Sequence, residues 1–400
     1  MSNNINTPRL RFPEFTGEWD YVYGNELFEP ISNKNHNSDL PILALTQEQG
    51  AVPRDMINYN VVVSDKSVAG YKVVEVDDFI ISLRSFQGGI EYSRYKGLCS
   101  PAYIVLRKKS KDLSSDFYRI YFKSFNYIQA LNKNLEGIRD GKMISYQQFS
   151  EIKLPKPSPA EQEKIAACLT EMDNLISAQA QKVDALKEKK KGLMQQLFPQ
   201  PGQTTPQLRF PGFTGDWDFV DGDDLFEPIS NKNHNSDLPV LALTQDQGAV
   251  PRDIINYNVI VSDKSVAGYK VVEVDDFIIS LRSFQGGIEY SRYKGLCSPA
   301  DIVLRKKSDK LCSDFYRIYF KSFNYIQALN KNLEGIRDGK MISYKQFSEI
   351  KLPKPSPSEQ QKIAECLSAL DEQIAAESAK VDALKDHKKG LMQQMFPIGK

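Results

Sequence analysis

The sequence repeats itself at a fixed offset of 198 residues, so that Leu10–Pro199 aligns with Leu208–Pro397 without a gap. Few positions differ between Leu27 and Ser158, and most of these differences conserve side-chain volume or are typical of a surface. The two halves must therefore share one fold. Because solenoid repeats have periods of only about 20–50 residues, the pattern indicates a duplicated domain rather than a repeat array.

The composition fits a globular chain with two domains. Its 400 residues leave room for a core in each half, and 41% of them are hydrophobic and 26% charged. No apolar run reaches the roughly eighteen residues of a membrane span, and the N-terminus lacks the apolar segment of a secretion signal. The five cysteines show no CxxC spacing, so we expect reduced cysteines and a cytoplasmic protein.

Each half ends in a predicted long helix. Ser158 is expected as the N-cap, Pro159 as the first helical residue, and Glu161 as the partner that completes a capping box. Apolar residues then step by four and three positions, a coiled-coil pattern interrupted only at Gln179 and Lys190 and at the matching positions of the copy. The stripe residues are Ile165, Leu169, Met172, Ile176, Val183, Leu186, Leu193, Ile363, Leu367, Leu370, Ile374, Val381, Leu384 and Leu391.

So narrow a stripe is suited to a single partner helix, and the obvious partner is the helix of the other half. A helical hairpin inside an ordinary core and a homodimeric zipper are the alternatives. Gly192 is unfavourable inside a helix by about 1 kcal/mol, which predicts bending or fraying of the last turns. Residues 160–181 differ between the copies much more than the preceding blocks do, and retain only the pattern.

The block before each helix has a mixed pattern of strands and helices. Short β-branched runs separated by glycines predict strands at residues 41–46, 60–64, 71–83 and 102–108. Apolar residues at three- and four-residue steps, including Phe117, Tyr121 and Phe125, predict one helix over residues 115–131. The globular part is therefore expected to contain both strands and helices.

Enzyme signatures are scarce. His36 and His234 lie in a polar, Asn-rich stretch without metal-ligand spacing, which favours a solvated loop. Asp140, Glu151 and Lys153 are of the residue types found in metal-dependent nucleases, but no third acidic group is placed by the sequence. We keep a metal-dependent nuclease using these residues and their repeats as one alternative, and a coiled-coil adaptor without DNA as another.

A polar and basic stretch remains in each half. Lys+Arg number 52 against 51 Asp+Glu, so a polyanionic partner would have to be met by a local patch. Arginine, glutamine, serine and tyrosine around a Gly-containing loop are side chains that contact base edges and phosphates, although a solvated charged surface would look the same. The candidate DNA-binding residues are Arg84, Ser85, Gln87, Tyr92, Arg94, Lys96, Arg139, Lys142, Arg282, Ser283, Gln285, Tyr290, Arg292, Lys294, Arg337 and Lys340.

Three segments in a fixed order carry a family resemblance. LRFPEFTGEWD near the start, LPKPSPAEQEKIAACL after the globular block and KKGLMQQLFP at the helix end all recur in the second half. Together they resemble the specificity subunit of type I restriction–modification systems. The resemblance implies a non-catalytic chain in which each globular block is a target recognition domain for one half of a split DNA site. It also implies two long helices that pair antiparallel, set the half-site distance and dock two methyltransferase subunits.

The same resemblance assigns S-adenosylmethionine, ATP and Mg²⁺ to the methyltransferase and the restriction/translocase subunits, with no cofactor and no metal in this chain. The expected fold is α+β, with two mixed α/β recognition domains separated by an antiparallel coiled coil in a pseudo-two-fold repeat. The expected boundaries are 1–157 and 208–355 for the recognition domains, 158–198 and 356–396 for the long helices, and 199–207 for the linker.

The sequence departs from the family pattern in one respect. The family normally carries two dissimilar recognition domains, whereas these two are near copies. Two like domains related by an approximate two-fold axis should recognise like half-sites in inverted orientation. We therefore predict a split palindromic target. Differences at Tyr103/Asp301, Lys111/Asp309 and Gln147/Lys345 could make the half-sites unequal if those residues touch DNA.

Overall fold

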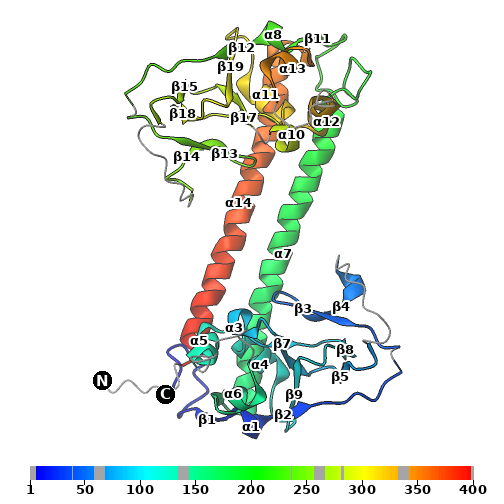
Figure 1. The fold of residues 1–400 in the computed structure, drawn as a ribbon, viewed down its shortest axis with the longest axis vertical. Coiled ribbons are helices and arrows are strands. Elements are labelled where there is room, and N and C mark those ends of the chain that lie inside the picture. The colour runs from blue at the N-terminus through cyan, green and yellow to red at the C-terminus, as the bar shows by residue number, and fades with distance from the viewer. Residues whose placement is uncertain are drawn as a thin grey trace. The chain divides into compact units, whose positions relative to one another are not determined.

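The computed structural model describes residues 6–37, 39–57, 68–133, 144–235, 237–255, 266–280, 283–331 and 342–397. The chain forms two compact units (Figure 1). Unit 1 comprises Met1–Ala180 and Ala379–Lys400, and unit 2 comprises Gln181–Ser378. Each unit thus contains one globular block, the first part of one long helix and the last part of the other. No helix in the described ranges is long and apolar enough to cross a membrane.

The first globular block is built around an antiparallel sheet with strand order β2-β9-β6-β7. Strand pairs β1-β10, β3-β4 and β5-β8 surround it, and short helices complete the block. Its elements are β1 (Asp20–Tyr23), α1 (Gly24–Leu27), β2 (Phe28–Ile31), β3 (Leu43–Thr46), β4 (Gly50–Pro53), η1 (Arg54–Met56), β5 (Lys72–Val74), β6 (Phe79–Ile81), α3 (Ser85–Gly88), β7 (Glu91–Tyr92), β8 (Gly97–Cys99), β9 (Ile104–Lys108), α4 (Ser115–Tyr121), α5 (Phe125–Lys133), α6 (Tyr146–Ser150) and β10 (Lys153–Lys156).

The second globular block has the same fold, as the duplication predicts. Its central sheet has strand order β12-β19-β16-β17. The elements are β11 (Asp218–Asp221), α8 (Gly222–Leu225), β12 (Phe226–Ile229), β13 (Leu241–Thr244), β14 (Gly248–Pro251), β15 (Lys270–Val272), β16 (Phe277–Ile279), α10 (Ser283–Gly286), β17 (Glu289–Tyr290), β18 (Gly295–Cys297), β19 (Ile302–Lys306), α11 (Ser313–Tyr319), α12 (Phe323–Lys331), α13 (Tyr344–Ser348) and β20 (Lys351–Lys354). The expected α+β fold of two mixed domains is confirmed.

The helix predicted over residues 115–131 is wrong in its continuity, because the structure has two helices there, α4 and α5. Ser124 separates them, and its Oγ accepts a hydrogen bond from the Tyr127 backbone N at 3.3 Å, as a helix cap does. The break lets Phe122 and Tyr127 both enter the core, whereas Phe125 is 62% exposed. The strand expected at residues 60–64 lies outside the described residues.

The long helices are α7 (Pro159–Leu197) and α14 (Pro357–Met395), each of 39 residues. At about 1.5 Å per residue each is roughly 60 Å long. Helix α7 runs through Gly192 without interruption, so the expected fraying of its last turns does not occur. Every predicted stripe residue is buried or half-buried, including the polar positions Gln179 and Glu377.

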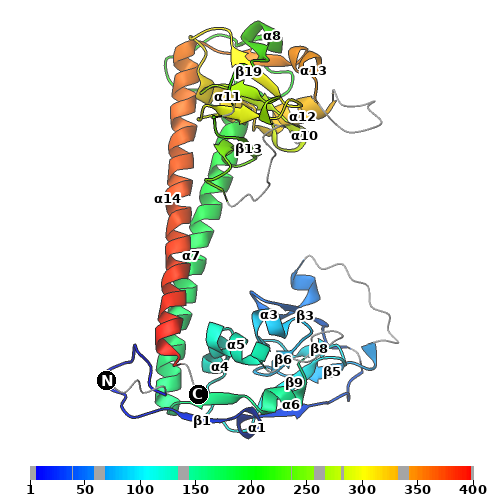
Figure 2. The same ribbon diagram turned by 60° about the vertical axis from the view of Figure 1, so that its left-hand side comes forward.

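Within each unit the two helices run antiparallel, as predicted (Figure 2). In unit 1, Lys388 Nζ lies 2.5 Å from Asp173 Oδ1. In unit 2, Lys190 Nζ lies 2.5 Å from Asp371 Oδ1, and Lys182 Nζ lies 2.8 Å from Glu377 Oε1. The residue numbers of the ion-pair partners rise along α7 and fall along α14, as expected for antiparallel helices. The lysines that interrupt the stripe therefore pair with carboxylates of the facing helix.

The repeated motif LRFPEFTGEWD forms a lead segment, Leu10–Asp20, that connects the two helices of unit 1. The backbone N of Leu10 donates to the carbonyl O of Gln394 at the end of α14, at 3.1 Å. Arg11 binds the carboxylate of Glu161, at the start of α7, through Nε–Oε1 at 2.7 Å and Nη2–Oε2 at 2.8 Å. Arg11 Nη1 also donates to the carbonyl of Gly17. The segment thus ties the end of one helix to the start of the other.

This arrangement corrects the predicted capping box. Ser158 Oγ does accept from the Glu161 backbone N at 3.3 Å, but the Glu161 side chain is engaged by Arg11. Unit 2 repeats the arrangement, with Leu208 N donating to Gln196 O at 3.0 Å and Arg209 Nε at 2.7 Å from Glu359 Oε1.

The Tyr103/Asp301 difference between the two globular blocks lies beside a small apolar cluster. Tyr103 packs beside the apolar cluster that includes Val74, Ile80 and Val105 of the first block. Its counterpart in the second block is Asp301, which is 9% exposed. Burial raises the pKa of the Asp301 carboxyl from its ordinary value to about 6, against smaller opposing effects of a hydrogen bond at Ser298 and of Lys270.

The second unit should therefore lose stability as the pH rises. The folded chain binds the Asp301 proton more tightly than the unfolded chain does, so ionisation favours unfolding between the unfolded pKa, near 4, and the folded pKa, near 6. Asp301→Tyr, which installs the residue of the first copy, should stabilise unit 2 by about 2 kcal/mol more at pH 7.5 than at pH 4.5. Urea denaturation at the two pH values measures this. Asp309→Lys, an exchange at an exposed position, is the control, and a pH-independent effect of Asp301→Tyr would contradict the assignment.

Candidate nucleic-acid interface

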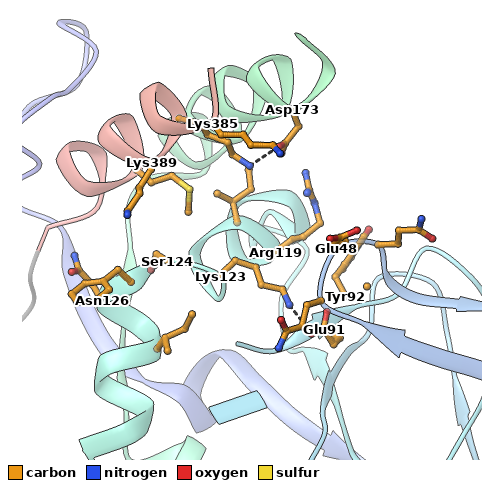
Figure 3. A pocket seen from close by; sticks show the side chains of 18 of the residues that line it. Glu48, Glu91, Tyr92, Arg119, Lys123, Ser124, Asn126, Asp173, Lys385 and Lys389 are labelled. Atoms are coloured by element: carbon orange, nitrogen blue, oxygen red, sulfur yellow. Dashed lines mark hydrogen bonds and ion pairs between the residues drawn. The ribbon is translucent and has the colours of Figure 1, made fainter. Parts of the chain in front are cut away.

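A cavity of about 730 Å³ opens in unit 1 between the globular block and the helix pair (Figure 3). The β3–β4 turn contributes Gln47 to Gly50, and strand β7 with the loop after it contributes Glu91, Tyr92 and Arg94. Helices α4 and α5 and the segment between them add Arg119, Ile120, Lys123, Ser124, Phe125, Asn126 and Ile128. Helix α7 adds Asp173, and the end of α14 adds Lys385, Lys388, Lys389, Met392 and Gln393. Segments distant in the sequence thus share one concave wall.

Positive charge predominates in this cavity. Its lining contains six basic residues (Arg94, Arg119, Lys123, Lys385, Lys388 and Lys389) and three acidic ones (Glu48, Glu91 and Asp173). Lys123 Nζ lies 2.6 Å from Glu91 Oε1, and Lys388 is paired with Asp173. Arg119 pairs with Asp116, outside the lining, at 3.0 Å. Arg94, Lys385 and Lys389 make no ion pair with any residue that the structure describes.

The Glu91–Lys123 pair forms part of the cavity wall. Glu91 is 4% exposed, and its burial raises the pKa of the carboxyl, against the opposing charge of Lys123. Gly50 allows the close approach of the turn to β7, because a Cβ atom there would lie 2.4 Å from the carbonyl O of Tyr92. Gly50 also has a φ of +76°, which disfavours other residues. The shape of the cavity wall therefore depends on the close approach of the β3–β4 turn to β7, as well as on the Glu91–Lys123 ion pair.

Of the residues predicted from sequence, the cavity brings together Tyr92 and Arg94. The Arg94 guanidinium lies over the Tyr92 ring, 5.7 Å from its centroid. The Tyr92 hydroxyl donates to Asp77 Oδ1 at 2.5 Å, and its ring packs against Phe79 at a centroid distance of 5.3 Å. Tyr92 is thus held in place and supports an exposed arginine at the cavity edge.

The other predicted residues that the structure describes do not line this cavity. Arg84 and Gln87, around α3, are exposed and do not line the cavity, and Lys96 pairs with Glu75 at 2.9 Å. Ser85 is 1% exposed, and its Oγ accepts from the Ser82 backbone N at 2.9 Å, which gives it a structural place in the turn. In the second copy Gln285, Arg292 and Lys294 are exposed, Tyr290 is half-buried and Ser283 is buried. Arg139, Lys142, Arg282, Arg337 and Lys340 lie outside the described residues.

The sequence interpretation did not select Arg119, Lys123 or the lysines of the α14 end. Arg119 and Lys123 lie in the stretch predicted as one helix over residues 115–131. The lysines belong to basic runs at 187–191 and 385–389, just before the repeated GLMQQ segment. Those runs could have identified the site only together with the antiparallel register, which places the end of α14 beside the first block.

Of the residues of the nuclease alternative in the first half, the structure describes Glu151 and Lys153. Asp140 lies outside the described residues. Glu151 is exposed after α6 and accepts from Gln147 Nε2 at 3.3 Å. Lys153 Nζ lies over the Tyr23 ring, 5.9 Å from the centroid. His36 Nε2 lies 3.1 Å from the Tyr71 carbonyl O. Among the described residues no group of three or more His, Cys, Asp or Glu side chains is arranged to hold a metal ion.

Comparison with known families decides the assignment. The family model described as the type I restriction modification DNA specificity domain matches twice, over residues 22–188 and 215–386. The chain belongs to this family. The curated relatives include the type I restriction enzyme MjaVIII specificity subunit of Methanocaldococcus jannaschii, 24% identical over 97% of this chain and 93% of the relative. A second protein of that organism, provisionally named the MjaX specificity subunit, is 24% identical over 98% and 96%.

Solved structures share the fold. The type I restriction–modification S subunit from M. genitalium has a TM-score of 0.54 at 15% identity, covering 98% of this chain and 100% of its own. A chain from a study of the assembly and conformational transition of a type I restriction–modification system has a TM-score of 0.57 at 17% identity, covering 96% and 98%. The resemblance noted from the three repeated segments is confirmed. This chain is a specificity subunit, the DNA-recognition component and not the catalytic one.

Proposed function

We propose that this specificity subunit recognises a bipartite, inverted-repeat DNA target and docks two methyltransferase subunits, together with restriction/translocase subunits, in the cytoplasm. The observation that carries the proposal is the near identity of the two globular blocks, each packed against the start of one long helix and the end of the other. Two like recognition surfaces joined to an antiparallel helix pair are expected to contact like sequences on opposite strands.

We assign the parts of the chain accordingly. Residues 1–157 and 208–355 would recognise the half-sites, the helices 158–198 and 356–396 would set the spacing between them, and 199–207 would link the halves. The exposed arginine pair Arg94 and Arg292 is the best candidate for base contacts, because arginine is the side chain most often used to recognise guanine in the major groove.

The target sequence tests the proposal directly. Methylated positions should be mapped in DNA from cells that carry the system, with cells lacking this chain as the control. We expect one short sequence to occur on both strands in inverted orientation on either side of an unspecified spacer. Two unrelated half-sites would contradict the palindrome, and a continuous target would contradict the bipartite model.

A further inference from the structure

We propose that the lysines at the end of each long helix bind the DNA backbone at the half-site recognised by the other half's globular block. The inference rests on the proposed function and specifies which surface meets the phosphates. In unit 1 the lysines are Lys385 and Lys389 on α14, and the globular block is the first one. Each half-site would then be bound by a composite surface made from both halves of the chain.

The geometry favours these two lysines over their neighbours. Lys385 and Lys389 lie four residues apart on α14, so they project from the same side of the helix. Both are exposed, and both line the cavity. Lys388, between them, also lines it, but is held by Asp173 at 2.5 Å. Figure 3 shows Lys385 and Lys389 on one wall of the cavity and Arg119 and Lys123 on the wall across from them.

The charges suit an extended polyanion. Lys123 and Lys388 have carboxylate partners, so ligand binding there would have to disrupt existing ion pairs. Lys385, Lys389 and Arg94 instead offer charges with no ion-pair partner in the described part of the chain. They come from two separate elements, α14 and the loop after β7, that flank one open concavity. A duplex backbone, with its evenly spaced phosphates, can engage both elements at once.

Helix α7 carries lysines at the positions that match those of α14, although neighbouring positions differ between the two helices. The counterparts of Lys385, Lys388 and Lys389 are Lys187, Lys190 and Lys191 on α7. Lys187 and Lys191 are exposed, and Lys190 is held by Asp371 at 2.5 Å. Unlike Lys389, Lys191 has an exposed ion-pair partner, Glu188, at 4.0 Å. The two intervening positions differ between the copies, as Glu188/Asp386 and Lys189/His387, and all four residues are exposed. The divergent helices thus retain a lysine at each of the three positions that line the unit 1 cavity.

An acidic face of a protein partner is the competing occupant. Phe125, 62% exposed, lines the same cavity, and an exposed aromatic residue beside lysines also suits protein docking. We favour DNA, because Arg94 of the candidate recognition loop shares the cavity with the lysines. The experiment below separates the two occupants.

The test uses the chain assembled with its methyltransferase subunits and a duplex that carries the mapped target. Lys385→Gln with Lys389→Gln should reduce the slope of log Kobs against log salt by about 0.9 per lost phosphate contact, hence by about 1.8. Lys187→Gln with Lys191→Gln should have the same effect, and the quadruple variant should lose about 3.6. Base preference should be unchanged, and arginine at the same positions should restore the slope.

A control removes two exposed lysines that do not face the cavity, Lys189 and Lys362, of which Lys362 has an exposed ion-pair partner, Glu365, at 3.8 Å. A wild-type slope in the Lys385/Lys389 variant, with specific binding intact, would overturn the inference and leave the proposed function standing. Loss of methyltransferase subunits from the complex at an unchanged slope would assign the surface to protein docking and also overturn it. Absence of specific DNA binding by the wild-type complex would instead refute the proposed function, and the inference with it.

Discussion

Replacing Arg11 with alanine should destabilise unit 1 by about 3–5 kcal/mol, because the substitution leaves a buried carboxylate without its cation. Glu161 is 2% exposed, and Arg11 binds both of its oxygens. The substitution also frees the turn carbonyl of Gly17, to which Arg11 donates. Arg209→Ala should have the same effect in unit 2, where Glu359 is likewise 2% exposed.

Urea denaturation of the full chain, monitored separately for each unit, measures this loss. Arg9→Ala is the matched control, because Arg9 is an exposed arginine two residues away from Arg11. Replacing both partners, Arg11→Met with Glu161→Leu, should recover most of the stability, since no uncompensated charge remains. A loss below about 1 kcal/mol for Arg11→Ala, within the range of exposed ion pairs, would show that the lead segment does not secure the helices.

Replacing both Arg94 and Arg292 with alanine should weaken binding to the mapped target by about 2–6 kcal/mol, since a good bidentate base contact contributes about 1–3 kcal/mol of discrimination. Each single substitution should give about half of the effect, because the two blocks are near copies. The loss should fall on the specific target far more than on unrelated DNA. Competition binding with the assembled complex measures both affinities.

Lys109→Ala with Lys307→Ala is the control, since these are exposed cations of the same blocks that do not line the unit 1 cavity or occupy its matching positions. An unchanged ratio of specific to non-specific affinity in the arginine variant would remove Arg94 and Arg292 from base recognition. A reduced salt slope with an unchanged ratio would reassign them to phosphate contacts.

The local sequence pattern predicted the structure correctly where residues close together in the sequence determine it. The duplication alone implied two blocks of one fold, and the step of four and three residues from Ile165 onward identified the face of α7 that is buried. The same local signals failed where packing competes with periodicity. Phe125 fits a helical stripe, yet the chain turns at Ser124 and exposes its ring, while Phe122 and Tyr127 on either side of the break are buried.

Contacts between residues far apart in the sequence determined the features that the local pattern predicted wrongly. Glu161 has the spacing of a capping residue, but Arg11, 150 residues away, takes its carboxylate. Ser85 has the chemistry of a DNA contact, but the turn before α3 buries it. The sequence shows which side chains are apolar or charged. It does not show which distant residues contact them in the folded chain.

The amino-acid sequence by itself determined the duplication, the two long amphipathic helices and, through its three repeated segments, the family. Only the tertiary structure decided that the lysines at the end of α14 face the first block rather than the second. The physical reason is the register of the antiparallel pair. Buried stripe residues and the pairing of Lys388 with Asp173 select that register, and the sum of those contacts across two helices cannot be seen in either helix alone.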